Sequence, residues 1–125
     1  MTKTILLILF DVLVSVAGQL TLKRGMMEVG KIDAAFFANP LAGIWRMFTT
    51  TPLVLLGLAM YGVGAFIWLI VLSRANLSYA YPMIALTYVL VPLAAWLFLN
   101  EPAIPPLRWA GMALIIVGVA LVAQS

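Results

Sequence analysis

The side chains best suited to chemistry form a polar stripe in an apolar N-terminal segment: Asp11, Ser15, Gly18 and Gln19. Spacings of four, three and one residues place them on one face of an α-helix. A carboxylate in the middle of a membrane costs about 2.5–3.5 kcal/mol, so it usually faces a cavity or a partner. The stripe therefore predicts the polar wall of a translocation path. The alternatives are that Asp11 reaches back to water and that Ser15 and Gln19 make hydrogen bonds between helices.

A second apolar stretch, which contains prolines and tyrosines, covers residues 72–102. It is nearly uncharged and long enough to cross a bilayer. Pro82 and Pro92 each remove a backbone donor and free a carbonyl one turn earlier. Tyr81 and Tyr88, seven residues apart, share a helix face. Broken helices are tolerated where neighbours or a cavity satisfy the backbone, and they are common in transporters.

Residues 53–72 form another apolar segment with a distinctive face: Gly57, Tyr61, Gly64 and Trp68. Small residues on one face allow helices to approach closely. Tyr61 and Trp68 would then line a groove. Tight packing with an aromatic residue at the membrane interface is the alternative.

Charged side chains border the apolar segments. Arginine offers a fork of donors that suits a lipid phosphate, although anchoring at the membrane surface explains such residues equally well. The candidates for substrate contact are Lys23, Arg24, Arg74 and Arg108, with Glu101 as a lone carboxylate in a loop.

Composition sets the class of the protein. Of its 125 residues, 66% are hydrophobic and 9% are charged, against roughly 25% charged residues in soluble domains. We therefore expect one integral membrane domain over residues 1–125, with no soluble catalytic domain. The absence of cysteine and histidine excludes disulfides and the commonest metal ligand. No nucleophile–base pair or phosphate loop is present, so we expect no enzyme, no metal and no cofactor. The net charge of +3 reflects topology and lipid headgroups, not nucleic-acid binding.

The elements that must position these residues are four transmembrane helices, over about 4–22, 53–72, 77–99 and 107–123. The first imitates a signal peptide, but its apolar run continues beyond a cleavage point, which favours a retained helix. Asn39 and Pro40 can cap and start a short helix over 41–48, lying in the membrane plane. Gly111 and Gly118, seven residues apart, predict a face for contact with a second subunit. A dimer is expected because four helices enclose too little volume for a guarded path.

The predicted helices place both termini on one side of the membrane. The first and third loops contain Lys23, Arg24, Lys31, Arg46 and Arg108, whereas the other side contains Lys3 and Arg74. The positive-inside rule therefore puts the termini outside and the more basic loops in the cytoplasm.

Short segments in all four helices resemble the drug/metabolite transporter superfamily in its small four-helix form (EamA/small multidrug resistance-like), and most closely the aminoarabinose-phosphoundecaprenol flippase subunits of the ArnE/ArnF type. The matching segments are SVAGQL at 15–20 before Lys23, LGLA at 56–59, Trp68-Leu69 with Val71-Leu72, AYPM at 80–83, Glu101-Pro102, and Arg108-Trp109 with Gly111. The long first loop matches poorly.

The small multidrug resistance family of proton-coupled exporters is a more distant resemblance. That family has an essential carboxylate eight residues before a lysine at the end of its first helix. Here Ser15 stands eight residues before Lys23, and Asp11 lies one turn further away. This departure argues against proton-coupled export of cations.

The resemblance implies a flippase for a polyprenyl-phosphate-linked sugar in the bacterial inner membrane. The lipid tail would stay in the bilayer while the headgroup passes a polar groove, with Lys23 and interfacial arginines capturing phosphate. An inside-negative potential would favour outward movement of a single anion by about 2.3 kcal/mol per 100 mV. The expected partners are the lipid-linked sugar phosphate, membrane lipids and a similar four-helix subunit, in a homodimer or heterodimer. The alternatives are an exporter of small cations or metabolites, marked by drug protection that depends on Asp11 or Glu101, and a partner subunit without transport of its own.

Overall fold

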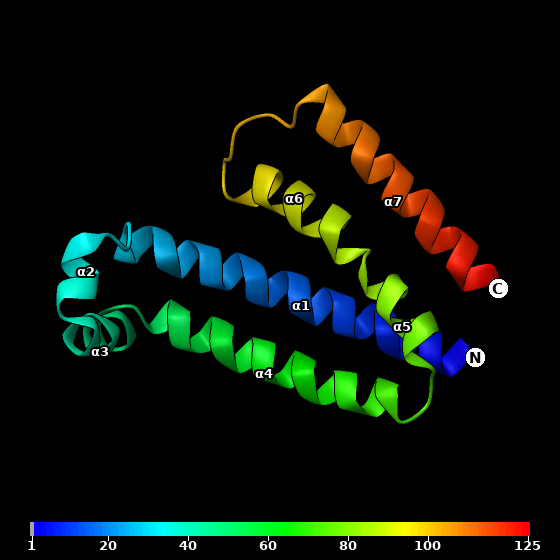
Figure 1. The fold of residues 1–125 in the computed structure, drawn as a ribbon, viewed down its shortest axis with the longest axis horizontal. Helices are drawn as coiled ribbons and strands as arrows, with labels where there is room; N and C mark the ends of the chain where they lie inside the picture. Colours follow the sequence, from blue (N-terminus) through cyan, green and yellow to red (C-terminus); the bar gives the residue numbers. More distant parts are fainter. Residues whose placement is uncertain (1) are drawn as a thin grey trace.

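The computed structural model describes residues 2–125 and is helical apart from its connections (Figure 1). In chain order the helices are α1 (Thr2–Val29), α2 (Ala34–Ala38), α3 (Pro40–Thr50), α4 (Pro52–Leu72), α5 (Leu77–Ile84), α6 (Thr87–Phe98) and α7 (Pro106–Gln124). Four stretches are long and apolar enough to cross a membrane: α1, α4, α5 with α6, and α7. The prediction of an all-α fold with four transmembrane helices is confirmed.

Close packing between α1 and α4 is the most extensive helix contact, and glycines make it possible. A Cβ atom added at Gly57 would lie 2.7 Å from Cγ and 2.9 Å from the backbone nitrogen of Leu22. One added at Gly25 would lie 2.9 Å from Cγ2 of Val54. The two helices run antiparallel (Figure 1), so successive turns of α1 meet successive turns of α4 in reverse order. Small residues thus bring the two backbones together, as the face of α4 predicted.

The third span is interrupted between α5 and α6. The break at residues 85–86 follows Pro82 by one turn, and shorter i→i+3 bonds replace the α-helical ladder there. The amide of Ala85 donates to the carbonyl of Pro82 at 3.0 Å, and that of Tyr88 donates to Ala85 at 2.9 Å. Pro92 lies within α6, which continues through it. The predicted interruption therefore comes from the first proline only.

The first helix is longer than the sequence predicted. It continues past residue 22 to Val29, so Lys23 and Arg24 lie on the helix and not in a loop. Gly25 is kept in the helix by its packing against Val54, and Gly30, which adopts a φ of +87°, ends the helix. The four residues of the stripe and Lys23 therefore stand on one continuous helix.

The connection between α1 and α4 contains two short helices. Pro40 begins α3 as predicted, but Asn39 makes no side-chain capping bond. Instead Asp33 caps α2, an unpredicted helix, by accepting a 3.1 Å hydrogen bond from the amide of Ala35. Figure 1 views α3 nearly end-on while α1 and α4 lie in the page, so α3 runs across them, as a helix in the membrane plane would.

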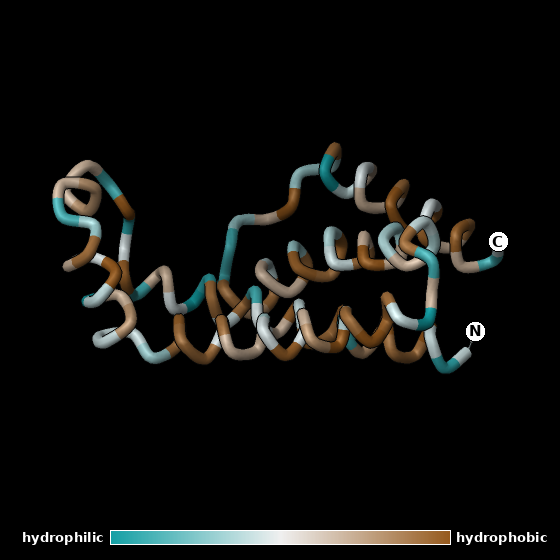
Figure 2. Tube along the Cα trace, turned by 60° about the horizontal axis from the view of Figure 1, so that its bottom comes forward, coloured by the Kyte–Doolittle hydropathy of each residue, from teal (hydrophilic) through white to brown (hydrophobic). Residues whose placement is uncertain are grey.

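Polar residues gather at the two ends of the helical body. Figure 2 shows hydrophilic colour in the connections and at the termini, and mostly apolar colour along the long helices. Both termini and the turn between α4 and α5 lie at one end, whereas α2, α3 and the connection between α6 and α7 lie toward the other (Figure 1). Successive spans therefore run in opposite directions and both termini lie at the same end, as predicted.

The last helix is the least covered. Met112 is its buried residue, packed with Val89 and Ile104, and the rings of Trp96 and Trp109 meet edge to face at 5.9 Å. The rest of α7 is largely exposed.

We expect Gly57→Ala to lower the stability of the protein by about 1–3 kcal/mol, because its methyl group would press on Leu22 and force α1 and α4 apart. Thermal unfolding in detergent measures this. Gly62→Ala is the matched control, because nothing lies within 4 Å of its added Cβ. That control should gain about 0.5–1 kcal/mol from helix propensity. Equal effects of the two substitutions would contradict glycine-mediated packing.

Candidate functional site

A cavity of about 570 Å³ opens between α1, α4 and the broken third span. In Figure 1, α1 lies between α4 on one side and α5 and α6 on the other. The lining therefore has a base from α1 and two walls. Its residues are Asp11, Ser15, Gln19, Tyr61, Gly64, Ala65, Trp68, Tyr81, Ile84, Thr87, Tyr88, Val91 and Pro92.

The polar stripe of α1 forms the base of the cavity. Asp11, Ser15 and Gln19 all reach it, as their spacing predicted. Asp11 does not reach back to water: it is 2% exposed, and across residues 2–125 its Oδ1 has no hydrogen-bond partner. This burial argues against the alternative that Asp11 reaches back to water, and its place in a translocation path stays a prediction.

The absence of a side chain at Gly64 makes room for this carboxylate. A Cβ atom there would lie 3.2 Å from Oδ1 of Asp11 and 3.5 Å from Oγ of Ser15. Gly64 therefore contributes both to the close approach of α4 to α1 and to the shape of the cavity.

Aromatic rings form the walls. Tyr61 and Trp68 come from α4, and Tyr81 and Tyr88 come from α5 and α6. Trp68 and Tyr81 meet at 6.2 Å between ring centroids, with 63° between the ring planes. The three tyrosines are 48% to 67% exposed, so the rings stand at the rim. In a bilayer this rim would face lipid laterally.

The broken span places backbone acceptors beside the cavity. The hydroxyl of Thr87 donates to the carbonyl of Ile84 at 2.9 Å and so satisfies one carbonyl at the break. Pro92 has no N–H to donate to the carbonyl of Tyr88, one turn earlier. Both residues line the cavity, so the lining includes a residue whose carbonyl lacks its usual helical donor.

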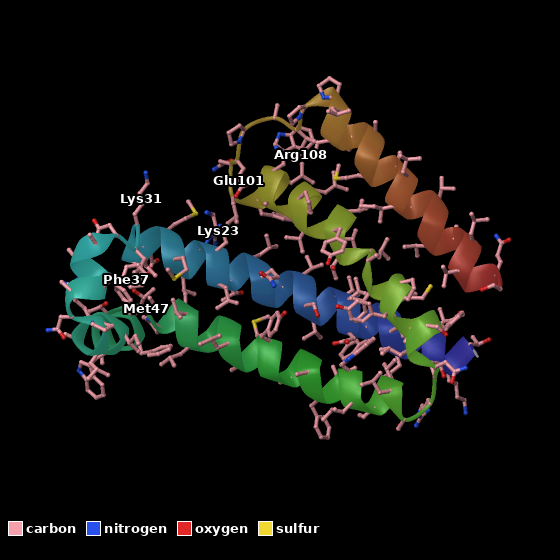
Figure 3. The ribbon with its side chains drawn as sticks, in the orientation of Figure 1. Lys23, Lys31, Phe37, Met47, Glu101 and Arg108 are labelled. Carbon is pink, nitrogen blue, oxygen red and sulfur yellow. The ribbon has the colours of Figure 1, made fainter. Side chains whose placement is uncertain are left out.

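The basic residues predicted to touch substrate lie outside this cavity. Lys23, Glu101 and Arg108 stand at the end where α1 passes the connection between α6 and α7 (Figure 3). Nη2 of Arg24 donates to the carbonyl of Phe98 at 3.3 Å. Arg24 therefore caps α6, because its C-terminal carbonyls lack helical partners. Sequence spacing did not predict this contact, since the residues are 74 positions apart.

Arg74 lies at the opposite end. With Asn76, Ser78 and Tyr79 it lines a second pocket of about 440 Å³, next to the end of α7. The predicted substrate residues are thus divided between one cavity and both ends of the helical body. Gly111 and Gly118 have nothing within 4 Å of an added Cβ and stay on the open face of α7.

Four residues of the lining are not marked by any polar or small-residue pattern in the sequence and were not predicted: Ala65, Ile84, Thr87 and Val91. Helical spacing from the tyrosines was the available signal, because Ile84 follows Tyr81 by three residues and Val91 follows Tyr88 by three.

Comparison with known proteins agrees with the resemblance seen in the sequence. No protein-family profile and no solved structure matches the chain. Curated relatives named "Probable 4-amino-4-deoxy-L-arabinose-phosphoundecaprenol flippase subunit ArnE" do match. The one from Pseudomonas aeruginosa is 41% identical over 81 residues, covering 65% of this chain and 70% of the relative. The one from Pseudomonas savastanoi pv. phaseolicola is 44% identical over 64 residues, covering 51% of this chain and 55% of the relative.

A Salmonella paratyphi B relative of the same name is 43% identical over 72 residues, covering 56% of this chain and 64% of the relative. The matched stretches thus range from about half to more than two thirds of the relatives' length. The polar stripe, the cavity with its aromatic rim and the four spans of this chain therefore occur in a protein of about the same length as these relatives. This multi-pass membrane protein belongs to the family of 4-amino-4-deoxy-L-arabinose-phosphoundecaprenol flippase subunits of the ArnE type.

Proposed function

We propose that this chain is a subunit of a flippase that moves a polyprenyl-phosphate-linked amino sugar, of the 4-amino-4-deoxy-L-arabinose-phosphoundecaprenol kind, across the bacterial inner membrane. The observation that carries the proposal is a cavity with a polar base and an aromatic rim, in a chain whose relatives bear that name. A transporter of this kind is not an enzyme and needs no cofactor.

The shape of the cavity suits a lipid-linked substrate. Its base is polar, and its rim carries exposed tyrosines that would face the surrounding lipid in a bilayer. A sugar headgroup can enter sideways while its polyprenyl tail remains in the bilayer. Hydroxyl, amide and carbonyl groups replace the water that the sugar loses, which limits the cost of taking it into the membrane.

The basic residues at the two ends supply separate places for the phosphate. Lys23 lies twelve residues from Asp11 on one helix, which is about 18 Å at 1.5 Å per residue. Arg74 borders the pocket at the other end. We infer that these cations receive the phosphate at the membrane surfaces and that the cavity between them takes the sugar.

The charge of the headgroup changes the energetics expected from the sequence. A phosphodiester carries one negative charge, and an aliphatic amine is charged near neutral pH. The polyprenyl-phosphate-linked amino sugar, called the amino sugar phospholipid below, is therefore a zwitterion with no net charge. The membrane potential then supplies no net drive, in contrast to the outward force expected for a single anion.

The open face of α7 is the proposed contact with a second subunit. Most of this helix is exposed, and Gly111 and Gly118 leave room for close approach. The relatives are named as subunits, which favours a heterodimer with a similar four-helix protein over a homodimer.

The transport proposal is tested in liposomes that contain this chain, alone and with a co-expressed four-helix partner. We expect movement of the amino sugar phospholipid between leaflets to exceed that in empty liposomes. Lys23→Ala and Gln19→Ala should each slow it by about tenfold, the effect of about 1.4 kcal/mol. Unchanged rates would refute the site, and absence of movement in every liposome would refute the function.

We expect the final distribution of the lipid between leaflets to be independent of an imposed potential. A singly charged headgroup would shift by about 50-fold at 100 mV, since 2.3 kcal/mol is involved. A potassium gradient with valinomycin sets the potential, and a dye confirms it. A shift approaching the larger value would contradict zwitterionic transport.

Gly118→Leu should weaken association of the subunits by about 1–3 kcal/mol, because the larger side chain overpacks the contact. Single-molecule photobleaching in lipid nanodiscs measures the dimer fraction. Gly62→Leu is the control, an equally open glycine on α4. Equal dimer fractions for both variants would place the interface elsewhere.

A further inference from the structure

Among the buried side-chain nitrogen and oxygen atoms of the described residues 2–125, Oδ1 of Asp11 is the one without a hydrogen-bond partner. Asp11 itself is 2% exposed. Burying a carboxylate without a partner is costly, and stable proteins normally pair such a group. A buried polar group without a partner in a native protein calls for an explanation, such as a bound ion or ligand. The missing partner is therefore expected in the ligand.

The cavity around Asp11 is built for a cation. Asp11 is the one residue with a formal charge among those that line it, and no lysine or arginine of the described chain reaches the lining. Four aromatic rings face the same space: Tyr61, Trp68, Tyr81 and Tyr88. Aromatic faces attract ammonium groups, and the attraction grows when the group is desolvated. The phosphate is disfavoured here, because like charges repel strongly at low dielectric.

The spacing along α1 separates the two charges of the substrate. Asp11 and Lys23 are about 18 Å apart along the helix, which is longer than a pentose joined to its phosphate. A headgroup whose amine contacts Asp11 therefore directs its phosphate along α1 toward the Lys23 end. The amine and the phosphate are recognised at different places along this helix.

We propose that Asp11 is the specificity-determining residue of the cavity and binds the protonated amine of the sugar, with the aromatic rings around it adding to the attraction for an ammonium group. This inference rests on the proposed function, since the amine belongs to the substrate assigned there. The Lys23 end serves the phosphate and does not discriminate between sugars.

The test compares two lipids in liposomes with no imposed potential: the amino sugar phospholipid and its N-acetylated derivative, in which the amine carries no charge. Wild-type protein should move the amine form about tenfold faster or more, the effect of one charge-assisted hydrogen bond. Asp11→Asn, of nearly the same shape, should abolish that preference by slowing the amine form alone. Glu28→Gln removes an exposed carboxylate of the same helix and should retain the preference.

Two further measurements keep the outcomes distinct. The same two headgroups on short prenyl chains are titrated into detergent-solubilised protein, so that binding is measured without transport. Preferential binding of the amine form that is lost in Asp11→Asn supports the inference even if no lipid moves, in which case only the flippase function fails. Asp11→Ser gives a second neutral variant if Asp11→Asn is not monodisperse on gel filtration. A preference retained in a folded neutral variant overturns the inference.

Discussion

The close approach of α1 to α4 is the constraint on which the rest of the structure depends. Glycines at 18, 25, 57 and 64 remove the side chains that would hold the helices apart. In lipid there is little hydrophobic force between helices, so van der Waals contact at short range must hold them together. The same approach seals one side of Asp11 against Gly64 and leaves its other side to the cavity. The packing of α1 against α4 therefore also shapes the cavity around Asp11.

The broken third span provides the complementary wall. A continuous helix would satisfy every backbone carbonyl and would present a uniform surface. The break after Pro82 lets α5 and α6 take separate directions, and both segments contribute tyrosines to the same rim. Backbone irregularity at membrane depth is tolerated only beside protein or a cavity, and here it lies beside the cavity. The result is a groove with polar groups inside and rings at its opening.

Charge is divided between the cavity and the ends of the helices. The cavity contains a carboxylate, and the basic side chains of Lys23, Arg74 and Arg108 stand toward the two ends of the helical body. A zwitterionic headgroup matches this division, because its ammonium suits the middle and its phosphate suits the ends. An anionic headgroup would be attracted at each surface and repelled between them. Specificity can therefore come from the interior while capture comes from the periphery.

The sequence by itself determined the four spans, their alternation and the polar face of α1, because hydrophobic length and helical periodicity are local properties of the chain. It also marked Tyr61, Trp68, Tyr81 and Tyr88, although it could not say that they share one space. Only the tertiary structure decided that Asp11 is buried without a partner, that Arg24 caps α6 across 74 positions, and that Lys23 lies outside the cavity. These depend on contacts between distant segments, which composition and spacing do not encode. The length of α1 was missed for a related reason, since charged residues near a membrane surface are compatible with either a helix or a loop.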